Sequence, residues 1–212
     1  MKSIKAGYEI IDKLDGKEIL KKIELCGRVC YKSEEKISED TAEKFVRGII
    51  KNGHESVLEH VSFTVRFIVD RGVSHELVRH RIASFSQEST RYCNYGHDDE
   101  ITVIEPLFWT EPHYTFSTTL ACRESWVASC RQSEKAYLDL LNLGKATPQE
   151  ARSVLPNSLK TEVIMTANLR EWRHFFRLRT AKAAHPQMRE VTIPLLADLQ
   201  TRIPVIFDDI NV

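Results

Sequence analysis

The segment VSFTVRFIV, residues 61–69, decides the class of fold. Its valines and phenylalanines fall at every second position, and Ser62, Thr64 and Arg66 lie between them. Successive side chains of a strand point to opposite faces, so this period of two predicts a strand with one buried face. The segments before and after it have helical spacing instead, which predicts a fold that combines strands with helices.

Apolar residues recur at helical spacing on both sides of this strand. Before it they predict a helix over residues 15–30 and another after Ser38, with Ser38 as its N-cap and Gly53 as the glycine beyond its end. After it they predict one long helix from about residue 112 to 143 and a further helix over residues 160–181. The C-terminal half is therefore expected to be mostly helical.

Shorter signals complete the expected fold. Residues 8–11 and 101–104 are predicted to form two more strands. The segment TPQE, residues 147–150, combines an N-cap, a first-turn proline and a capping-box glutamate, which predicts a helix start, and Pro156 ends that helix. Few strands among many helices predict an α+β fold with a small, mainly antiparallel sheet flanked by helices. We see no repeat or linker, so one domain over residues 1–212 is expected.

Composition excludes several classes of protein. The chain has 212 residues, with 30 basic and 30 acidic side chains and 42% hydrophobic residues. This is the composition of a globular protein, which argues against disorder, a membrane partner and a basic coat for nucleic acid. Five cysteines without a C-x-x-C pair, and an N-terminus without the apolar core of a signal peptide, predict a reducing compartment, the cytoplasm.

The segment GHESVLEH, residues 53–60, places two histidines and two carboxylates between a helix end and a strand. A zinc site is one interpretation, but His54 and His60 lie six residues apart and would not share a helix face. A polar loop is the simpler alternative. A third is that Ser56 and Glu59 form hydrogen bonds with a polar ligand.

The segment ELVRHR, residues 76–81, and the polar run that follows it form the second candidate site. Arginine and histidine favour the negative end of a helix dipole, so a solvated helix end is one interpretation. The alternative comes from Gln87, Ser89 and Arg91, which alternate and would point the same way in an extended chain. An amide, a hydroxyl and a guanidinium on one edge suit the base and phosphate of a nucleotide.

The third candidate site lies on the predicted helix over residues 160–181. A helical wheel places an apolar face at Leu169, Trp172, Phe175 and Phe176, with Asn168 and Arg179 on the same face. It places Arg170, Arg173 and Arg177 on the opposite, polar face. A guanidinium among aromatic rings needs an anionic partner, which for Arg179 is either an internal carboxylate or a bound phosphate or pyrimidine.

The cysteines offer no clear nucleophile. Four of them have the spacing of small hydrophobic residues in or near a helical core: Cys26, Cys30, Cys122 and Cys130. Cys93 alone lies near the polar segment, beside Arg91 and Tyr92, and is the one candidate for a reactive thiol.

Together these motifs match a known family. Arg79-His80-Arg81, seven residues and then Ser89 resembles the R-H-R-x7-S motif of flavin-dependent thymidylate synthases. Further segments resemble the family's other landmarks in the right order and at similar spacing: HESVLEH (54–60), RSVLP (152–156), NLR (168–170) and LR (178–179). The resemblance therefore spans residues 54–179.

The resemblance implies an enzyme that converts dUMP to dTMP without a cysteine nucleophile or a metal ion. It implies FAD as cofactor, 5,10-methylenetetrahydrofolate as methylene donor, NAD(P)H as reductant, and a homo-oligomer, the homotetramer of the family. Residues implied to face FAD are Ser56, Glu59, Arg79, His80, Arg81, Asn168, Arg170 and His174, where His174 replaces the usual asparagine. Residues implied to face dUMP are Glu76, Arg79, Gln87, Ser89, Arg91, Arg152 and Arg179, with Ser89 and Arg179 in catalytic roles.

A different class of function remains open on the residues alone. The segment over residues 79–91 would also serve a non-enzymatic module that binds nucleotides or RNA. A net charge of zero argues against RNA, because nonspecific binding of phosphates needs a positive field.

Overall fold

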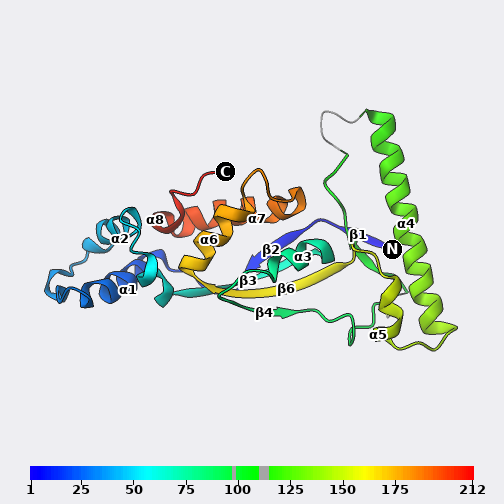
Figure 1. Ribbon diagram of the computed structural model, residues 1–212, viewed down its shortest axis with the longest axis horizontal. Helices are drawn as coiled ribbons and strands as arrows, with labels where there is room; N and C mark the ends of the chain where they lie inside the picture. Colours follow the sequence, from blue (N-terminus) through cyan, green and yellow to red (C-terminus); the bar gives the residue numbers. More distant parts are fainter. Residues whose placement is uncertain (97–98, 110–114) are drawn as a thin grey trace. The chain divides into compact units, whose positions relative to one another are not determined.

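The structure is a computed structural model that describes residues 1–96, 99–109 and 115–212 (Figure 1). The chain forms two compact units, which are described separately. The first unit comprises residues 1–7, 67–78 and 86–163, and the second comprises residues 8–66, 79–85 and 164–212. The single domain over residues 1–212 stays a prediction.

Strands and helices are mixed without regular alternation, which confirms the predicted α+β class with a small, mainly antiparallel sheet. The four-stranded sheet has the order β2-β3-β6-β4, from the strands Gly7–Ile10, Ser62–Asp70, Lys160–Asn168 and Ala83–Gln87. In β3 the predicted alternation is confirmed, because Phe63, Val65, Phe67 and Val69 are all buried. A separate pair of strands, β1 (Lys2–Ile4) and β5 (Thr102–Ile104), is parallel.

The predicted helix over residues 160–181 is wrong in its first half. Residues Lys160–Asn168 form β6, and helix α6 covers only Leu169–Arg179. Every second residue of β6 from Thr161 to Ala167 is buried, which is the period of a strand and not of a helix. The helical spacing of the aromatic residues belongs to α6 alone, and the β-branched residues before it favour the strand.

In the second unit, α6 packs against η2, α7 and α8, and α1 and α2 pack on each other beside them. The other helices of this unit are α1 (Gly16–Val29), α2 (Thr41–Lys51), α7 (Pro186–Arg202), α8 (Pro204–Phe207) and two short 3₁₀ helices, η1 (Glu34–Lys36) and η2 (Glu55–His60). Trp172 stacks on Phe63 with ring centroids 4.8 Å apart and donates from Nε1 to the Phe63 carbonyl. Phe176 meets the edge of Phe207 at 5.6 Å. The predicted apolar face of α6 is therefore confirmed, and it forms the core of this unit.

One predicted N-cap is wrong, and one predicted helix is confirmed. The helix predicted after Ser38 begins at Thr41, and its N-cap is Asp40 instead of Ser38. Ser38 lies two residues before Asp40, and its backbone N–H donates to the Thr41 hydroxyl at 3.0 Å. The helix over residues 15–30 is confirmed as α1, whose N-cap Asp15 accepts hydrogen bonds from two backbone N–H groups.

The first unit contains the long helix α4 (Phe116–Asn142) and the short elements α3 (Arg71–Leu77), α5 (Pro148–Ala151) and η3 (Arg152–Val154). Its core lies between α4 and the segments that pack on it: Ile101, Val103, Cys130, Tyr137, Ala151 and Leu159. The start predicted for the long helix, residues 112–114, lies outside the described residues, and Thr115 is the observed N-cap. The predicted capping box of α5 is confirmed. Over the described parts of the chain, no helix has the length and apolar character needed to cross a membrane.

Candidate functional site

Helix α2 ends in a turn that leads into the segment His54–His60. Gly53 has φ of 71°, and its N–H donates to the Ile50 carbonyl at 3.1 Å, whereas the His54 N–H reaches the Ile49 carbonyl at 3.0 Å. This pair of hydrogen bonds is a Schellman motif, and its left-handed residue favours glycine, as predicted. The turn leads into η2, where Ser56 and Glu59 are exposed on the surface.

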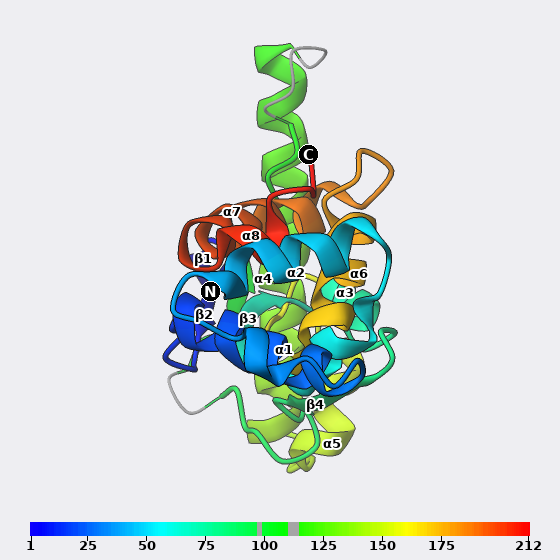
Figure 2. The same ribbon diagram turned by 90° about the vertical axis from the view of Figure 1, so that its left-hand side faces the viewer.

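A cavity of about 1030 Å³ lies beside this segment and extends between α1 and α2, which Figure 2 shows side by side. Its lining includes the predicted residues Ser56 and Arg170 together with a set of other charged side chains, Arg28, Lys36, Lys44, Asp40 and Glu55. A β-carbon on Gly27 would lie 2.6 Å from the Phe45 ring, so this glycine lets the two helices approach. The size and the excess of cations suit an anionic ligand of cofactor size.

The start of α6 holds two further predicted residues next to η2. Asn168 is the N-cap of α6 and accepts a hydrogen bond from the Glu171 N–H at 2.9 Å. Arg170 forms an ion pair with Glu59, which raises the pKa of Arg170. The structure thus brings together Glu59 and Arg170, two residues predicted to face the same ligand.

His80 is the buried centre of a second cluster in the same unit. Its Nε2 lies 2.8 Å from Arg179 Nε, and its Nδ1 lies 3.2 Å from Glu171 Oε1. Burial, followed by the charges of Arg179 and His174, lowers the pKa of His80 to about 4. The ring is therefore neutral at pH 7. Because an arginine Nε–H can only donate, the His80 Nε2 is the acceptor and its proton is on Nδ1, from which it donates to Glu171.

The neighbouring arginines of the motif differ from His80 in exposure. Arg79 and Arg81 are exposed, and Arg81 Nη1 donates to the His80 carbonyl at 2.9 Å. His174 is also exposed, with its ring centroid 6.1 Å from that of His80. Arg79, Arg81 and His174 therefore present polar groups to solvent around one buried imidazole.

The zinc site at His54 and His60 gains no support. Within the described residues, the histidine and carboxylate ligand atoms that come within 4.8 Å of one another belong to His80, Glu171 and His174. His54 and His60, which the sequence suggested as zinc ligands, are therefore not the residues whose ligand atoms lie close together.

Arg173 corrects the helical wheel, which placed it on the polar face of α6. Its side chain is completely buried and donates to both carboxylate oxygens of Asp209 at 2.7 Å and to Glu55 at 3.1 Å. The hydrogen bonds from Arg173 lower the pKa of Asp209. Helix α6 therefore has a second buried side beside its aromatic face, formed where η2 and the C-terminal segment supply the anions.

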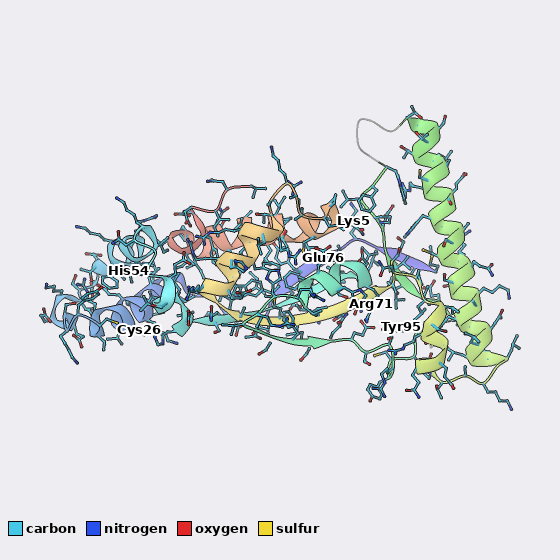
Figure 3. All side chains as sticks on the ribbon, viewed as in Figure 1. Lys5, Cys26, His54, Arg71, Glu76 and Tyr95 are labelled. Atoms are coloured by element: carbon cyan, nitrogen blue, oxygen red, sulfur yellow. The ribbon has the colours of Figure 1, made fainter. Side chains whose placement is uncertain are left out.

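In the first unit, α3 and the end of β4 hold the next predicted residues. Arg71 and Glu76 both belong to α3 (Figure 3). Arg71 Nη1 donates to the Glu88 carbonyl at 3.2 Å and to the Thr161 hydroxyl at 3.1 Å. Gln87 Nε2 donates to the Ser74 hydroxyl at 2.9 Å. These hydrogen bonds fix the amide of Gln87, the last residue of β4.

Ser89 and Arg91 do not continue the strand, so the predicted alternation of Gln87, Ser89 and Arg91 on one extended edge is wrong. The Ser89 hydroxyl accepts from the Arg91 N–H at 3.2 Å, and the Ser89 carbonyl accepts from the Cys93 N–H at 2.9 Å. Such hydrogen bonds close a turn. Arg152 joins this turn from η3, because its Nη1 donates to the Thr90 hydroxyl at 3.3 Å.

The predicted site residues thus fall into two groups, each gathered within its own unit. The second unit holds Ser56, Glu59, Arg79, His80, Arg81, Asn168, Arg170, His174 and Arg179. The first unit holds Glu76, Gln87, Ser89, Arg91 and Arg152.

Comparison with known proteins identifies the family. A family model described as thymidylate synthase complementing protein matches residues 9–205. The chain is 36% identical over 199 residues to the flavin-dependent thymidylate synthase of Mycobacteroides abscessus, covering 90% of this chain and 79% of that protein. This chain belongs to the flavin-dependent thymidylate synthase family. The enzyme of that name from Geobacter sulfurreducens is likewise 36% identical over 194 residues, covering 88% of this chain and 80% of that one.

A solved structure shares the fold of this flavin-dependent thymidylate synthase family member. The UMP/dUMP methylase PolB from Streptomyces cacaoi, bound with 5-Br dUMP, superposes with a TM-score of 0.80 at 24% identity, covering 98% of this chain and 96% of that chain. The family assignment confirms the predicted enzyme class and the predicted flavin cofactor.

The cysteine interpretation holds only in part for this family member. All five cysteines are free thiols, but only Cys130 is buried, and burial raises its pKa. Cys26 and Cys122 are partly buried and Cys30 is exposed, so Cys30 is not a core residue. Cys30 instead lines the cavity between α1 and α2.

Sequence reasoning missed several residues that lie beside the predicted ones. Glu171 is the carboxylate that contacts His80, and its spacing from His174, three residues on one helix, was the available signal. Lys36 and Lys44 line the cavity but come from separate elements, η1 and α2, so no linear pattern joins them.

Proposed function

We propose that this protein converts dUMP to dTMP, with the methylene group of 5,10-methylenetetrahydrofolate and reducing equivalents from NAD(P)H. The observation that carries the proposal is the family match over residues 9–205 together with the Arg79-His80-Arg81 and Ser89 motif within it. PolB, which shares the fold, is a UMP/dUMP methylase bound with 5-Br dUMP, and this supports a uracil nucleotide as substrate.

FAD is the proposed flavin, and the residues of the second unit fit it. The cavity of about 1030 Å³ joins Ser56 and Arg170 to further cations that suit a diphosphate. Glu59, paired with Arg170, borders the same side, and His80 offers a neutral ring beside the exposed Arg79 and Arg81. Asn168 and His174 complete the proposed set. When bound, FAD supplies hydride transfer.

The proposed dUMP residues divide by chemistry. Ser89, Arg91 and Arg152 gather at one turn of the first unit and offer a hydroxyl and two guanidinium groups to the phosphate. Gln87 and Glu76 lie on neighbouring segments and offer polar groups to the nucleoside. Arg79 is proposed to touch both ligands. Arg179 would stabilise negative charge that develops on the uracil as its C5 becomes nucleophilic.

The reaction is proposed to need no cysteine nucleophile. Cys93 is the one thiol near the Ser89 turn, and its N–H is used in closing that turn. The runner-up function, a module that only binds nucleotides or RNA, is less well supported, because the relatives are named as synthases and the net charge is zero.

We further propose a cytoplasmic homotetramer. A chain of 212 residues that binds a cofactor and three substrates has little surface on which to form every binding site alone. This favours sites to which more than one copy of the chain contributes residues. Light scattering of the active protein tests this point, since a mass of one chain with full activity would contradict it.

One assay tests the function directly. The purified protein is incubated with dUMP, 5,10-methylenetetrahydrofolate and NADPH or NADH, with and without added FAD, and dTMP is measured. We expect a yellow protein whose visible absorption is lost when NADPH is added with dUMP, and dTMP only when every substrate is present. The matched control is Arg202→Ala, an arginine on α7 paired with Asp198, which should leave turnover unchanged. A colourless protein that ignores FAD and makes no dTMP would contradict the proposal.

A further inference from the structure

Glu171 is a largely buried carboxylate that none of the proposed roles uses. It is the third residue of α6, and its side chain is only 11% exposed. Burial raises its pKa, so the fold holds this carboxylate at a cost that an exposed position would avoid. A costly buried group with one well-defined contact calls for a specific explanation.

The contact that Glu171 makes is to the imidazole that holds Arg179. Glu171 Oε1 lies 3.2 Å from His80 Nδ1, and His80 Nε2 lies 2.8 Å from Arg179 Nε. His80 itself is 4% exposed in its side chain, and the edge of its ring meets Phe175 at 4.9 Å between centroids. The ring therefore contacts Phe175 on one side and two polar groups at its nitrogens, which restricts its rotation.

The directions of these hydrogen bonds follow from the groups themselves. Arg179 Nε–H can only donate, so His80 Nε2 must carry a lone pair. A neutral imidazole then carries its proton on Nδ1, and a carboxylate opposite Nδ1 stabilises that tautomer over the other. Without the carboxylate, only the Arg179 N–H would favour this tautomer, and the Nδ1 proton would have no acceptor at Glu171.

We propose that Glu171 is a positioning residue that orients Arg179 through His80. The inference rests on the proposed role of Arg179 in binding dUMP and adds a residue to that site. Glu171 fixes the tautomer of His80, and that tautomer offers Arg179 an acceptor at one place only. The guanidinium is thereby held in one orientation before the nucleotide binds, which reduces the ordering needed on binding.

A divalent metal ion is the competing use of the same side chains. His80, Glu171 and His174 have the donor set of a two-histidine, one-carboxylate site, with ligand atoms within 4.8 Å of one another. A metal on His80 Nδ1 would have to replace the proton that the Arg179 hydrogen bond requires there. The contact with Arg179 therefore favours the hydrogen-bonded chain over the metal, and zinc titration becomes an arm of the test.

Two variants separate an acceptor role from a charge role. Glu171→Gln keeps a carbonyl oxygen for the His80 Nδ1–H, whereas Glu171→Leu removes the acceptor. We expect Glu171→Leu to weaken dUMP binding about tenfold and Glu171→Gln by no more than about twofold, with FAD content unchanged in both. Asp198→Leu, which removes a carboxylate from the exposed pair with Arg202, is the matched control. Equal losses in the Gln and Leu variants would assign Glu171 to the helix dipole and overturn the proposal.

A double-mutant cycle tests whether Glu171 acts through Arg179. In an Arg179→Ala background, Glu171→Leu should have no further effect on dUMP affinity, because the residue that it positions is gone. Additive losses in the two variants would overturn the proposal. Calorimetric titration with dUMP needs no turnover, so this arm does not depend on the folate or nicotinamide substrates.

Spectroscopy of the histidines decides the tautomer independently of dUMP. With ¹⁵N-labelled histidine, the His80 ring should show a protonated Nδ1 and an unprotonated Nε2 between about pH 5.5 and about pH 8. The charged and titratable groups facing this ring are Arg179, Glu171, His174 and Arg81. In Glu171→Leu the two tautomers should mix.

Two results would contradict this expectation. A proton on Nε2 in the unsubstituted protein, or stoichiometric Zn²⁺ binding that shifts the signals of His80 and His174 together, would overturn the proposal. If the unsubstituted protein fails to bind dUMP, the proposed function is wrong. The tautomer of His80 then remains the test of the hydrogen bonds from Glu171 through His80 to Arg179.

Discussion

Arg173 and Arg179 lie six residues apart on α6, yet the fold surrounds them differently. Arg173 is completely buried and binds the carboxylates of Asp209 and Glu55. Arg179 is partly exposed, and its Nε is held by a neutral imidazole. A carboxylate neutralises a guanidinium, whereas an imidazole orients it without removing its charge. The comparison separates an arginine whose buried contacts are carboxylates from one whose Nε contacts an imidazole and which we propose binds dUMP.

The largest effect is expected for Arg173. Arg173→Leu removes the buried guanidinium that Glu55 and Asp209 share and leaves them only the exposed Arg177, which should lower the free energy of unfolding by about 3–5 kcal/mol. Chemical denaturation measures the loss. Arg177→Leu is the matched control, because Arg177 approaches the same two carboxylates from an exposed position and should cost less than about 1 kcal/mol. Similar losses in the two variants would mean that burial does not distinguish these arginines.

The next effect is a dependence of stability on pH that comes from His80. Its pKa is lowered from 6.5 to about 4, so between these values the unfolded chain binds a proton that the folded chain does not. Stability should therefore fall as the pH falls through this window, by on the order of 2 kcal/mol, because the unfolded state binds more protons there. Comparison of unfolding curves for the unsubstituted protein and His80→Gln isolates this contribution, and the exposed His75→Gln serves as control. An identical pH profile in His80→Gln would show that the imidazole is not held neutral.

The sequence predicted some of these features and not others, for physical reasons. The strand of β3 and the aromatic face of α6 follow from periodicity, because each buries alternate or helically spaced side chains against one layer. The burial of Arg173 did not follow, because its anions come from η2 and the C-terminal segment, 118 and 36 residues away in sequence. Strand β6 was missed because the helical pattern of α6 begins directly after it, with no proline or glycine between them.

The candidate site divides in the same way. Motif resemblance supplied its residues, but not their contacts, since the His80 partners Glu171 and Arg179 lie 91 and 99 residues further along the chain. The turn at Ser89 was not predicted, because its hydrogen bonds are local and leave no pattern of hydrophobic residues.

A smaller effect is expected for Arg179 itself. Arg179→Ala should weaken dUMP binding by the value of a charge-assisted hydrogen bond, about 1.5–3 kcal/mol, while FAD stays bound. Calorimetric titration with dUMP measures the change, and Arg202→Ala is the control for loss of an arginine from the same unit. Unchanged dUMP affinity with a lowered melting temperature would place Arg179 with Arg173 among the structural arginines and remove the contrast between them.

The smallest effect is expected for substitution of Cys93. This substitution tests whether the charge of the Arg179 guanidinium is enough to activate the nucleotide. If Arg179 stabilises the charge that develops on the uracil, no thiolate has to attack the ring, and Cys93→Ala should keep dTMP formation within about tenfold, or about 1.4 kcal/mol of barrier. Cys122→Ala, at a partly buried thiol on α4, is the matched control for loss of a thiol. Loss of a true nucleophile lowers turnover by orders of magnitude. A loss of that size with the fold and FAD content intact would mean that a thiol, and not an oriented guanidinium, carries the activation of dUMP.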